Sequence, residues 1–245
     1  MYEKLHGIVL NVIRYNDRHN IAHVYTDAHG MMSFLVAQGV TRGARLRNAM
    51  FMPLSLIELE ARRMPGRELA TMRDVRRYAM LADIYADPVK NAIALFVSEL
   101  LTRVIHEQER NGALYSYVEQ SVILLENLQA GVANFHICFL YHLGAHLGIQ
   151  PDLDTYRSGR WFDMDNGVFV DNPAAMAGAG RHLLVPEEAH VIHLLSHMTF
   201  AGLHHFRFNR DERNRVLDTI IAYYRLHNST IGTLRSPEVL KQLFV

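Results

Sequence analysis

Apolar and polar residues alternate along the first 75 positions with the period of two that is typical of half-buried β-strands. The segment 54–63 shows this alternation most clearly, because Glu58 and Glu60 are interleaved with Ile57 and Leu59. Strands are predicted over five segments separated by turns and loops: 5–15, 21–26, 31–37, 54–63 and 67–72. Five short strands within about 75 residues predict a small closed β-barrel of the OB type.

From Asp74 onward the apolar residues recur every three or four positions, which is the period of an amphipathic helix. Helices are predicted over 75–86, 89–110, 114–128, 132–147, 186–203 and 211–227, with a short one from 236. The fold class is therefore α+β: an OB-type barrel over 1–78, followed by an all-helical domain over 79–245. Residues 152–185 are predicted to form an irregular insertion in the helical domain.

The formal net charge of the 245 residues is zero, because 25 Lys and Arg balance 25 Asp and Glu. This total hides a split along the chain. Residues 1–80 contain twelve basic and seven acidic residues, a balance of +5, whereas residues 81–245 contain thirteen and eighteen, a balance of −5. Such an asymmetry indicates two parts with different partners.

A barrel with an arginine-bearing loop suits single-stranded nucleic acid, because guanidinium groups contact phosphates and surface aromatic rings stack on bases. We expect phosphate contacts from three arginines of an acid-free loop, supported by four others: Arg42, Arg45 and Arg47, then Arg14, Arg73, Arg76 and Arg77. Tyr15, Tyr25 and Phe34 are the candidates for stacking on bases. A solvated surface balanced by charges elsewhere would explain the same arginines, and a core position would explain the same aromatic residues.

Histidine is the unusual residue in the composition, with fifteen copies. His190, His193 and His197 are three and four positions apart, so they would share one helix face and could ligate zinc. The pattern is not that of a zinc hydrolase helix, because apolar residues occupy its middle positions. A histidine-metal hydrolase built on these three residues is the alternative function, and the wet face of a helix is the simpler explanation. The single cysteine, Cys138, excludes an internal disulfide.

Residues 127–151 contain no Asp, Glu, Lys or Arg, a run long enough to raise the question of a membrane span. Histidines and glycines interrupt its apolar residues, so we expect a buried central helix and no membrane contact. The first residues show no signal peptide, and a cytoplasmic protein is expected.

Short motifs spread in order over nearly the whole chain resemble the bacterial recombination mediator family RecO. They include Lys4 with Gly7–Leu10, Leu54–Leu59, Gly66–Ala70, Phe139–Pro151 and Leu234–Ser236. The resemblance implies a DNA repair protein that is not an enzyme and needs no cofactor, acting at the nucleoid. It would bind single- and double-stranded DNA without sequence specificity and anneal complementary strands. Its implied partners are RecR and the C-terminal tail of the single-stranded DNA-binding protein SSB, and it would help to load RecA onto SSB-coated DNA.

Two departures from the family pattern affect these expectations. Many relatives carry a zinc site of two Cys-x-x-Cys pairs, but Thr155 and Ser158 stand at the first pair here, and hydroxyls cannot replace thiolates. We therefore predict a shortened insertion without metal. In relatives a Lys or Arg usually stands at the position of His142, which would receive the carboxylate of the SSB tail only when protonated. A helical adaptor whose barrel binds only protein is a third interpretation, and it predicts no affinity for DNA at low salt.

Overall fold

The structure is a computed structural model that describes residues 1–39, 48–63, 66, 68–171 and 182–243. Its contacts group these residues into two compact units: 1–128 together with 233–243, and 129–232. The helices that follow the barrel, up to residue 128, belong to the same unit as the barrel. The predicted boundary at 78/79 divides the chain by type of element, and as a statement about folding domains it stays a prediction.

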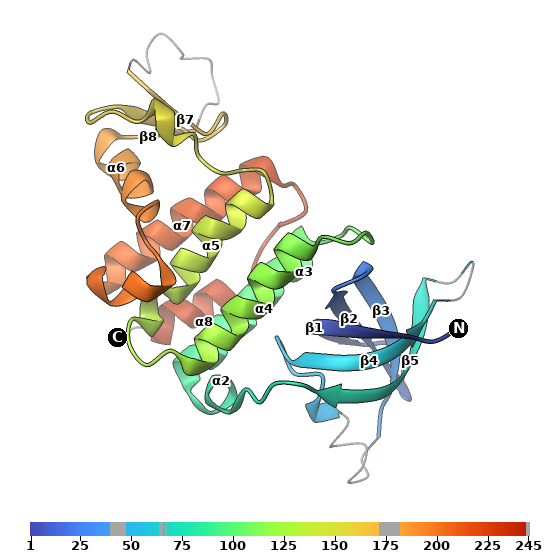
Figure 1. Ribbon diagram of the computed structural model, residues 1–245. Coiled ribbons are helices and arrows are strands. Elements are labelled where there is room, and N and C mark those ends of the chain that lie inside the picture. Colours follow the sequence, from blue (N-terminus) through green and yellow to red (C-terminus); the bar gives the residue numbers. More distant parts are fainter. Residues whose placement is uncertain (40–47, 64–65, 67, 172–181, 244–245) are drawn as a thin grey trace. The chain divides into compact units, whose positions relative to one another are not determined.

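The first unit opens with five strands that form a closed barrel in the order β1-β2-β3-β5-β4 (Figure 1). Their bounds are Glu3–Arg14, His19–Thr26, Gly30–Ala37, Leu56–Arg62 and Leu69–Arg77 for β1 to β5. The contacts of β1 with β2 and β4, of β2 with β3 and of β4 with β5 are antiparallel, and β3 meets β5 in parallel. A five-stranded barrel of this kind is the OB-type arrangement, so the predicted fold class is confirmed.

The period-two alternation directs every second apolar side chain of the barrel into a common core. Val24, Phe34 and Ile57 are fully buried there, and Val9 and Leu59 complete the contacts between neighbouring strands. Burial of side chains of this size contributes about 1.5–3 kcal/mol each. The hydrophobic pattern of the strands thus accounts for a large part of the stability of the barrel.

The first unit also contains the helices α2 (Ala82–Ala86), α3 (Pro88–Val104), α4 (Gly112–Asn127) and α8 (Ser236–Leu243). The side chain of Asp87 caps α3 by accepting hydrogen bonds from the amides of Val89 and Lys90. The carboxylate of Glu99 on α3 accepts hydrogen bonds from the amide and hydroxyl of Ser236, the first residue of α8. Burial alone would raise the pKa of Glu99, but the hydrogen bonds from Ser236 and Arg235 outweigh it and lower the pKa. These bonds fix the last helix against α3.

Two predicted helix boundaries in the first unit are wrong. Residues 75–77 belong to β5 rather than to a helix, because Val75 packs against the barrel core and Arg76 pairs across to β4. Helix α3 ends at Val104 rather than 110, because the carbonyl of Glu107 accepts a hydrogen bond of 2.9 Å from Met31 of the barrel. At this contact Gly30 has φ +61°, and a Cβ there would lie 2.4 Å from the Glu107 carbonyl oxygen.

The second unit contains α5 (Phe135–His146), α6 (Pro186–Leu195) and α7 (Arg210–His227), with 3-10 turns η1 (Val132–Asn134), η2 (Leu153–Thr155) and η4 (Phe200–His205). Helix α5 is almost entirely buried, as the absence of charged residues predicts. Within the described ranges, no helix is long and apolar enough to cross a membrane. The helix predicted over 186–203 ends early, because the Ser196 hydroxyl bonds to the carbonyl of His193 and Thr199 caps a new 3-10 turn.

The insertion is not irregular in the part that the structure describes. It forms a small sheet in the order β7-β6-β8, with β6 Trp161–Asp163, β7 Val168–Val170 and β8 Leu183–Leu184. The hydroxyl of Thr155 donates to the Asp152 carbonyl (2.6 Å) and accepts from the Phe169 amide (2.9 Å). The residue at the expected first thiolate position therefore joins η2 to the sheet through hydrogen bonds.

Candidate nucleic-acid interface

The arginines predicted to contact DNA fall into two sets. Three of them, Arg42, Arg45 and Arg47, lie outside the described residues, so their role stays a prediction. The other four belong to strands of the barrel: Arg14 ends β1, and Arg73, Arg76 and Arg77 lie on β5. The surroundings of Arg73 and Arg76 differ from those of Arg14 and Arg77.

Arg73 and Arg76 form ion pairs with acids of the neighbouring strand β4. The Nε of Arg73 lies 2.6 Å from Glu60, and the Nε of Arg76 lies 2.7 Å from Glu58. The antiparallel register sets these residues opposite each other, with a bulge between the two acids. The side chains of Arg73 and Arg76 remain 55% and 69% exposed, so solvent reaches both pairs. Their partners are more covered, with Glu60 34% and Glu58 13% exposed, but the exposed guanidinium groups remain accessible to a phosphate.

Two neighbours extend this charged surface toward the start of β1. Lys4 lies 2.8 Å from Glu58, and its hydrogen bond, together with that of Arg76, lowers the pKa of the Glu58 carboxyl. The guanidinium of Arg73 lies 4.1 Å from the centre of the Tyr2 ring, a cation–π contact. Tyr2 and Lys4 were not predicted as DNA contacts, because the strand register that brings them to β4 and β5 cannot be deduced from periodicity.

Arg14 and Arg77 do not join this surface. Arg14 lies at the opposite end of β1 from Lys4, 70% exposed and paired with Asp17 at 2.5 Å. Arg77 donates a hydrogen bond to the Ala49 carbonyl, and its guanidinium lies over the ring of Tyr85. Contact with a phosphate would require Arg77 to give up these internal partners, so Arg73 and Arg76 are the better placed members of the basic group.

The charge surplus of the first 80 residues is located mainly outside the strands. Four of the twelve basic residues in this part lie outside the described ranges, and all seven acids lie within them. Eight described bases against seven acids leave a balance of +1 for the described part of the barrel. The surplus of +5 therefore depends on four residues: Arg42, Arg45, Arg47 and Arg67.

The three aromatic candidates have different positions. Tyr25 and Phe34 are buried, whereas Tyr15, at the turn between β1 and β2, is 60% exposed. The strand register adds an apolar row beside it, because Ile21 of β2 pairs with Ile13 of β1 and with Leu35 of β3. Ile13 and Leu35 are partly exposed on the outer face of the barrel. A flat apolar surface next to an exposed tyrosine suits contact with nucleobases.

His142, the candidate for contact with the SSB tail, is half-buried on α5. Its Nε2 lies 2.7 Å from the carbonyl oxygen of Met198, and a carbonyl oxygen only accepts, so this nitrogen carries a hydrogen. A carboxylate partner would therefore have to be bound through Nδ1, in the doubly protonated ring.

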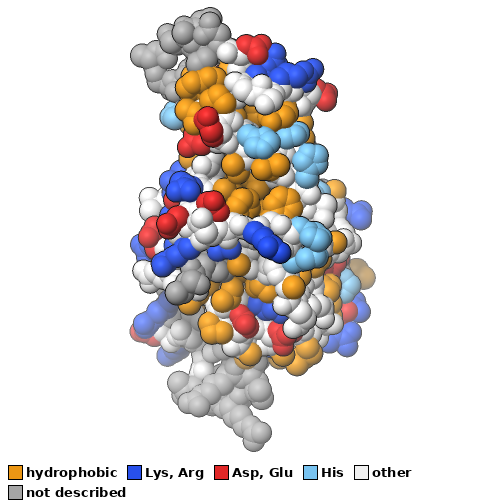
Figure 2. Space-filling model, turned by 90° about the vertical axis from the view of Figure 1, so that its left-hand side faces the viewer, with side chains coloured by type: hydrophobic (Ala, Val, Ile, Leu, Met, Phe, Trp, Pro, Cys, Tyr) orange, Lys and Arg blue, Asp and Glu red, His pale blue; other side chains and the backbone are white. Residues whose placement is uncertain are grey.

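The histidines at 190, 193 and 197 do not converge on one point: His190 and His193 on α6 contact Tyr156, and His197 lies in the turn just after the helix. The ring of Tyr156 lies parallel to that of His193 with centroids 3.7 Å apart, and its hydroxyl lies 2.7 Å from Nδ1 of His190. His197 meets His193 edge-on. Burial, and then His197 and His190, lower the pKa of His193. Figure 2 shows histidine side chains gathered among hydrophobic ones on the face of the molecule that it presents.

Among the residues that the structure describes, no three His, Cys, Asp or Glu side chains are placed to hold one metal ion. Two of the three histidines, His190 and His193, lie on α6, whereas the helix ends before His197; the rings make aromatic and hydrogen-bonding contacts with each other and with Tyr156.

A closed OB-type barrel followed by helices, with exposed arginines on the barrel, defines the class of OB-containing proteins that work through binding. The family models named Recombination protein O N terminal and Recombination protein O C terminal match residues 1–79 and 85–230. The DNA repair protein RecO of Bacteroides fragilis is 38% identical over 244 residues, and that of Phocaeicola vulgatus is also 38% identical, each match covering the whole of both chains. The RecO of Flavobacterium psychrophilum is 28% identical over the full length of both chains. The chain belongs to the RecO family.

Family membership decides between the functional classes that the sequence left open. RecO proteins are DNA repair mediators rather than catalysts, so the chain is not an enzyme. The interpretation of His190, His193 and His197 as a hydrolase centre is wrong. The misleading signal was their spacing, which predicts a shared helix face but not the direction of each ring.

Proposed function

We propose that this DNA repair protein binds single- and double-stranded DNA through its barrel, mainly by contacts to the backbone. The observation that carries the proposal is the pair of exposed arginines on β5, Arg73 and Arg76, whose partners are carboxylates that a phosphate can replace. Together with the surplus of arginines at 42–47 and 67, they make the barrel the basic part of a neutral chain. Backbone contacts of this kind carry no sequence information.

In the cell this binding would support annealing of complementary strands and loading of RecA onto SSB-coated DNA together with RecR. The protein would act in the cytoplasm, at the nucleoid. The acidic remainder of the chain is suited to protein partners, which fits the division of charge between its two parts.

The test is DNA binding and strand annealing measured at two salt concentrations with the purified full-length protein. The proposal expects binding at low salt that weakens steeply as salt rises, because phosphate contacts release counterions. A protein that binds no DNA at low salt would instead be the helical adaptor, whose barrel meets only protein.

We propose His142 as a contact for the SSB tail, supported by its place on the central helix α5, where its half-buried ring lies near that of Phe200. Titration with a peptide of the SSB C-terminus should show weaker binding for His142→Ala than for wild type. His146→Ala, one helical turn away, is the matched control. Equal affinities of wild type and His142→Ala would remove the residue from the site.

A further inference from the structure

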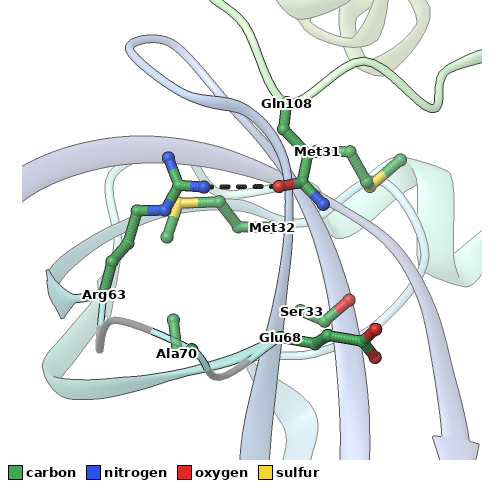
Figure 3. Close-up of a pocket in the computed structure, with 8 residues that line it drawn as sticks. Met31, Met32, Ser33, Arg63, Glu68, Ala70 and Gln108 are labelled. Atoms are coloured by element: carbon green, nitrogen blue, oxygen red, sulfur yellow. Dashed lines mark hydrogen bonds between the residues drawn. The ribbon is translucent and has the colours of Figure 1, made fainter.

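A cavity of about 560 Å³ opens on the barrel between the start of β3 and the connection from β4 to β5 (Figure 3). Met31, Met32 and Ser33 of β3 line one part of it, and Arg63 and Glu68 flank it from the β4–β5 connection. Gln108, from the segment between α3 and α4, closes it above. Its volume falls in the range of sites that hold small organic groups.

The position of the cavity in the fold points to nucleic acid as its occupant. In OB-type barrels the β2–β3 face and the β4–β5 connection are the surfaces that meet oligonucleotides. The cavity lies where β3 and that connection come together. An oligonucleotide that follows the barrel past Arg73 and Arg76 would therefore bring a base within reach of it.

The polar groups on the two sides of the cavity differ in their hydrogen-bonding roles. The guanidinium of Arg63 donates to the side-chain oxygen of Gln108 (3.3 Å), so the amide nitrogen of Gln108 is left as a donor beside the arginine. In Figure 3 these two residues lie on one side, and Glu68 lies on the other, beside Ser33. The hydroxyl of Ser33 is held by Nδ1 of His23 at 2.9 Å. One side of the cavity thus offers hydrogen-bond donors, and the other offers a carboxylate that only accepts.

A carboxylate on the path of a polyanion repels phosphates, so Glu68 would weaken binding unless it met hydrogen-bond donors of the ligand. Guanine has two adjacent donors, N1–H and N2–H, that match the two oxygens of a carboxylate. It also has two adjacent acceptors, O6 and N7, that match an arginine. Adenine, cytosine and thymine each lack at least one of these pairs.

We propose that this cavity is a guanine subsite, in which Glu68 accepts from N1–H and N2–H while Arg63 and Gln108 donate to O6 and N7. The inference rests on the proposed binding of single-stranded DNA and adds one local base preference to contacts that are otherwise insensitive to sequence.

The test compares fluorescein-labelled dT15 with a dT15 that carries one central guanine, by anisotropy, with the full-length protein. We expect the guanine oligonucleotide to bind about tenfold more tightly. Inosine at the same position lacks the N2 amino group and should lose most of this gain, and 7-deazaguanine should lose the part that depends on Arg63.

Glu68→Gln should bring guanine and inosine to nearly equal affinity, while dT15 binds as well as before or slightly better. Glu109→Gln is the matched control. It also removes one negative charge close to the barrel, but Glu109 does not line the cavity. It should keep the preference for guanine.

The outcomes separate the two proposals. Binding of dT15 with the expected salt dependence, but with equal affinity for the guanine oligonucleotide, would overturn the subsite and leave DNA binding intact. A preference for guanine that survives Glu68→Gln would also overturn it. A protein that binds neither oligonucleotide at low salt would overturn the proposed function itself.

Discussion

Arg73 of the barrel and two histidines of the second unit, His136 and His193, are potential cations that lie in opposite environments. The hydrogen bond that Arg73 donates to Glu60 raises the pKa of Arg73, which remains charged and exposed. Burial lowers the pKa of His136 to about 3, and burial together with neighbouring imidazoles lowers the pKa of His193. The barrel therefore keeps its positive charge at neutral pH, and those two histidines are held neutral. A count of basic residues predicts chemistry only when the partner of each one is known.

The largest expected effect concerns the three arginines at 42, 45 and 47. Changing all three to Ala should weaken binding of single-stranded DNA by about 10- to 100-fold at low salt, because this segment supplies most of the charge surplus. The slope of log K against log salt should fall by about 2, from three lost phosphate contacts at about 0.7 each. Anisotropy titrations at several salt concentrations measure both quantities.

A control with the same change in charge is Arg207→Ala with Arg210→Ala and Arg215→Ala, in the second unit. It should leave affinity and slope close to wild type. If the triple variant at 42, 45 and 47 matched wild type in both quantities, the barrel would not be the part that binds DNA.

The next largest effect is a pH dependence of stability that we expect from the buried, neutral His136. Its pKa is lowered from 6.5 to about 3 by burial and by the charge of Arg213, so the unfolded chain takes up the proton first as pH falls. The stability linked to this residue is complete above pH 6.5 and is lost as pH falls toward 3. At pH 5 the loss is about 2 kcal/mol. Urea unfolding at pH 7 and pH 5 should show it in wild type.

His136→Gln has no imidazole to protonate, so its stability should depend less on pH in this range. His205→Gln, at an exposed position, should behave like wild type. If His136→Gln does not fold, an NMR titration of the His136 imidazole in the wild-type protein provides the test. Protonation of His136 near pH 6 would contradict the conclusion that burial lowers its pKa.

A smaller effect is expected for the paired arginines of β5. Arg73→Ala with Arg76→Ala should lower DNA affinity by only about 2- to 5-fold, because each arginine must leave a carboxylate before it meets a phosphate. Glu58→Gln with Glu60→Gln should raise affinity by a similar factor. Arg157→Ala with Arg225→Ala is the control. A loss as large as that expected for residues 42–47 would show that the strand pairs, and not the loop, dominate binding.

The smallest effect is a local one at Glu58, whose pKa is lowered first by Lys4 and then by Arg76. Lys4→Met should move this pKa back toward its usual value, in a carbon-detected NMR titration of the carboxyl group. Because the folded pKa is the lower one, the stabilising contribution exists above the pKa of the unfolded chain and disappears as pH falls through the folded pKa. Arg14→Ala, which does not touch Glu58, should leave the titration unchanged.

The sequence predicted the type of nearly every element, because hydrophobic periodicity reports directly which face of a strand or helix is buried. Its errors lie where distant contacts decide the outcome. Val75 follows a helical period locally but continues β5, since the barrel core lies beside it. Helix α3 ends at Val104, because the carbonyl of Glu107 beyond it accepts a hydrogen bond from the amide of Met31 in β3. The insertion was predicted irregular because strands of two or three residues are too short to show a period.

For the candidate site, the residue types and the charge asymmetry were evident from the sequence alone, and so was the OB-type barrel that carries them. Only the tertiary structure decided which arginines have partners, because the pairs of Arg73 with Glu60 and of Arg76 with Glu58 depend on strand register and on a bulge. The same holds for the stacking of Tyr156 on His193 and for the cavity between Arg63 and Glu68. Charge and periodicity are properties of a linear chain, whereas the partner of a side chain is a property of its position in space.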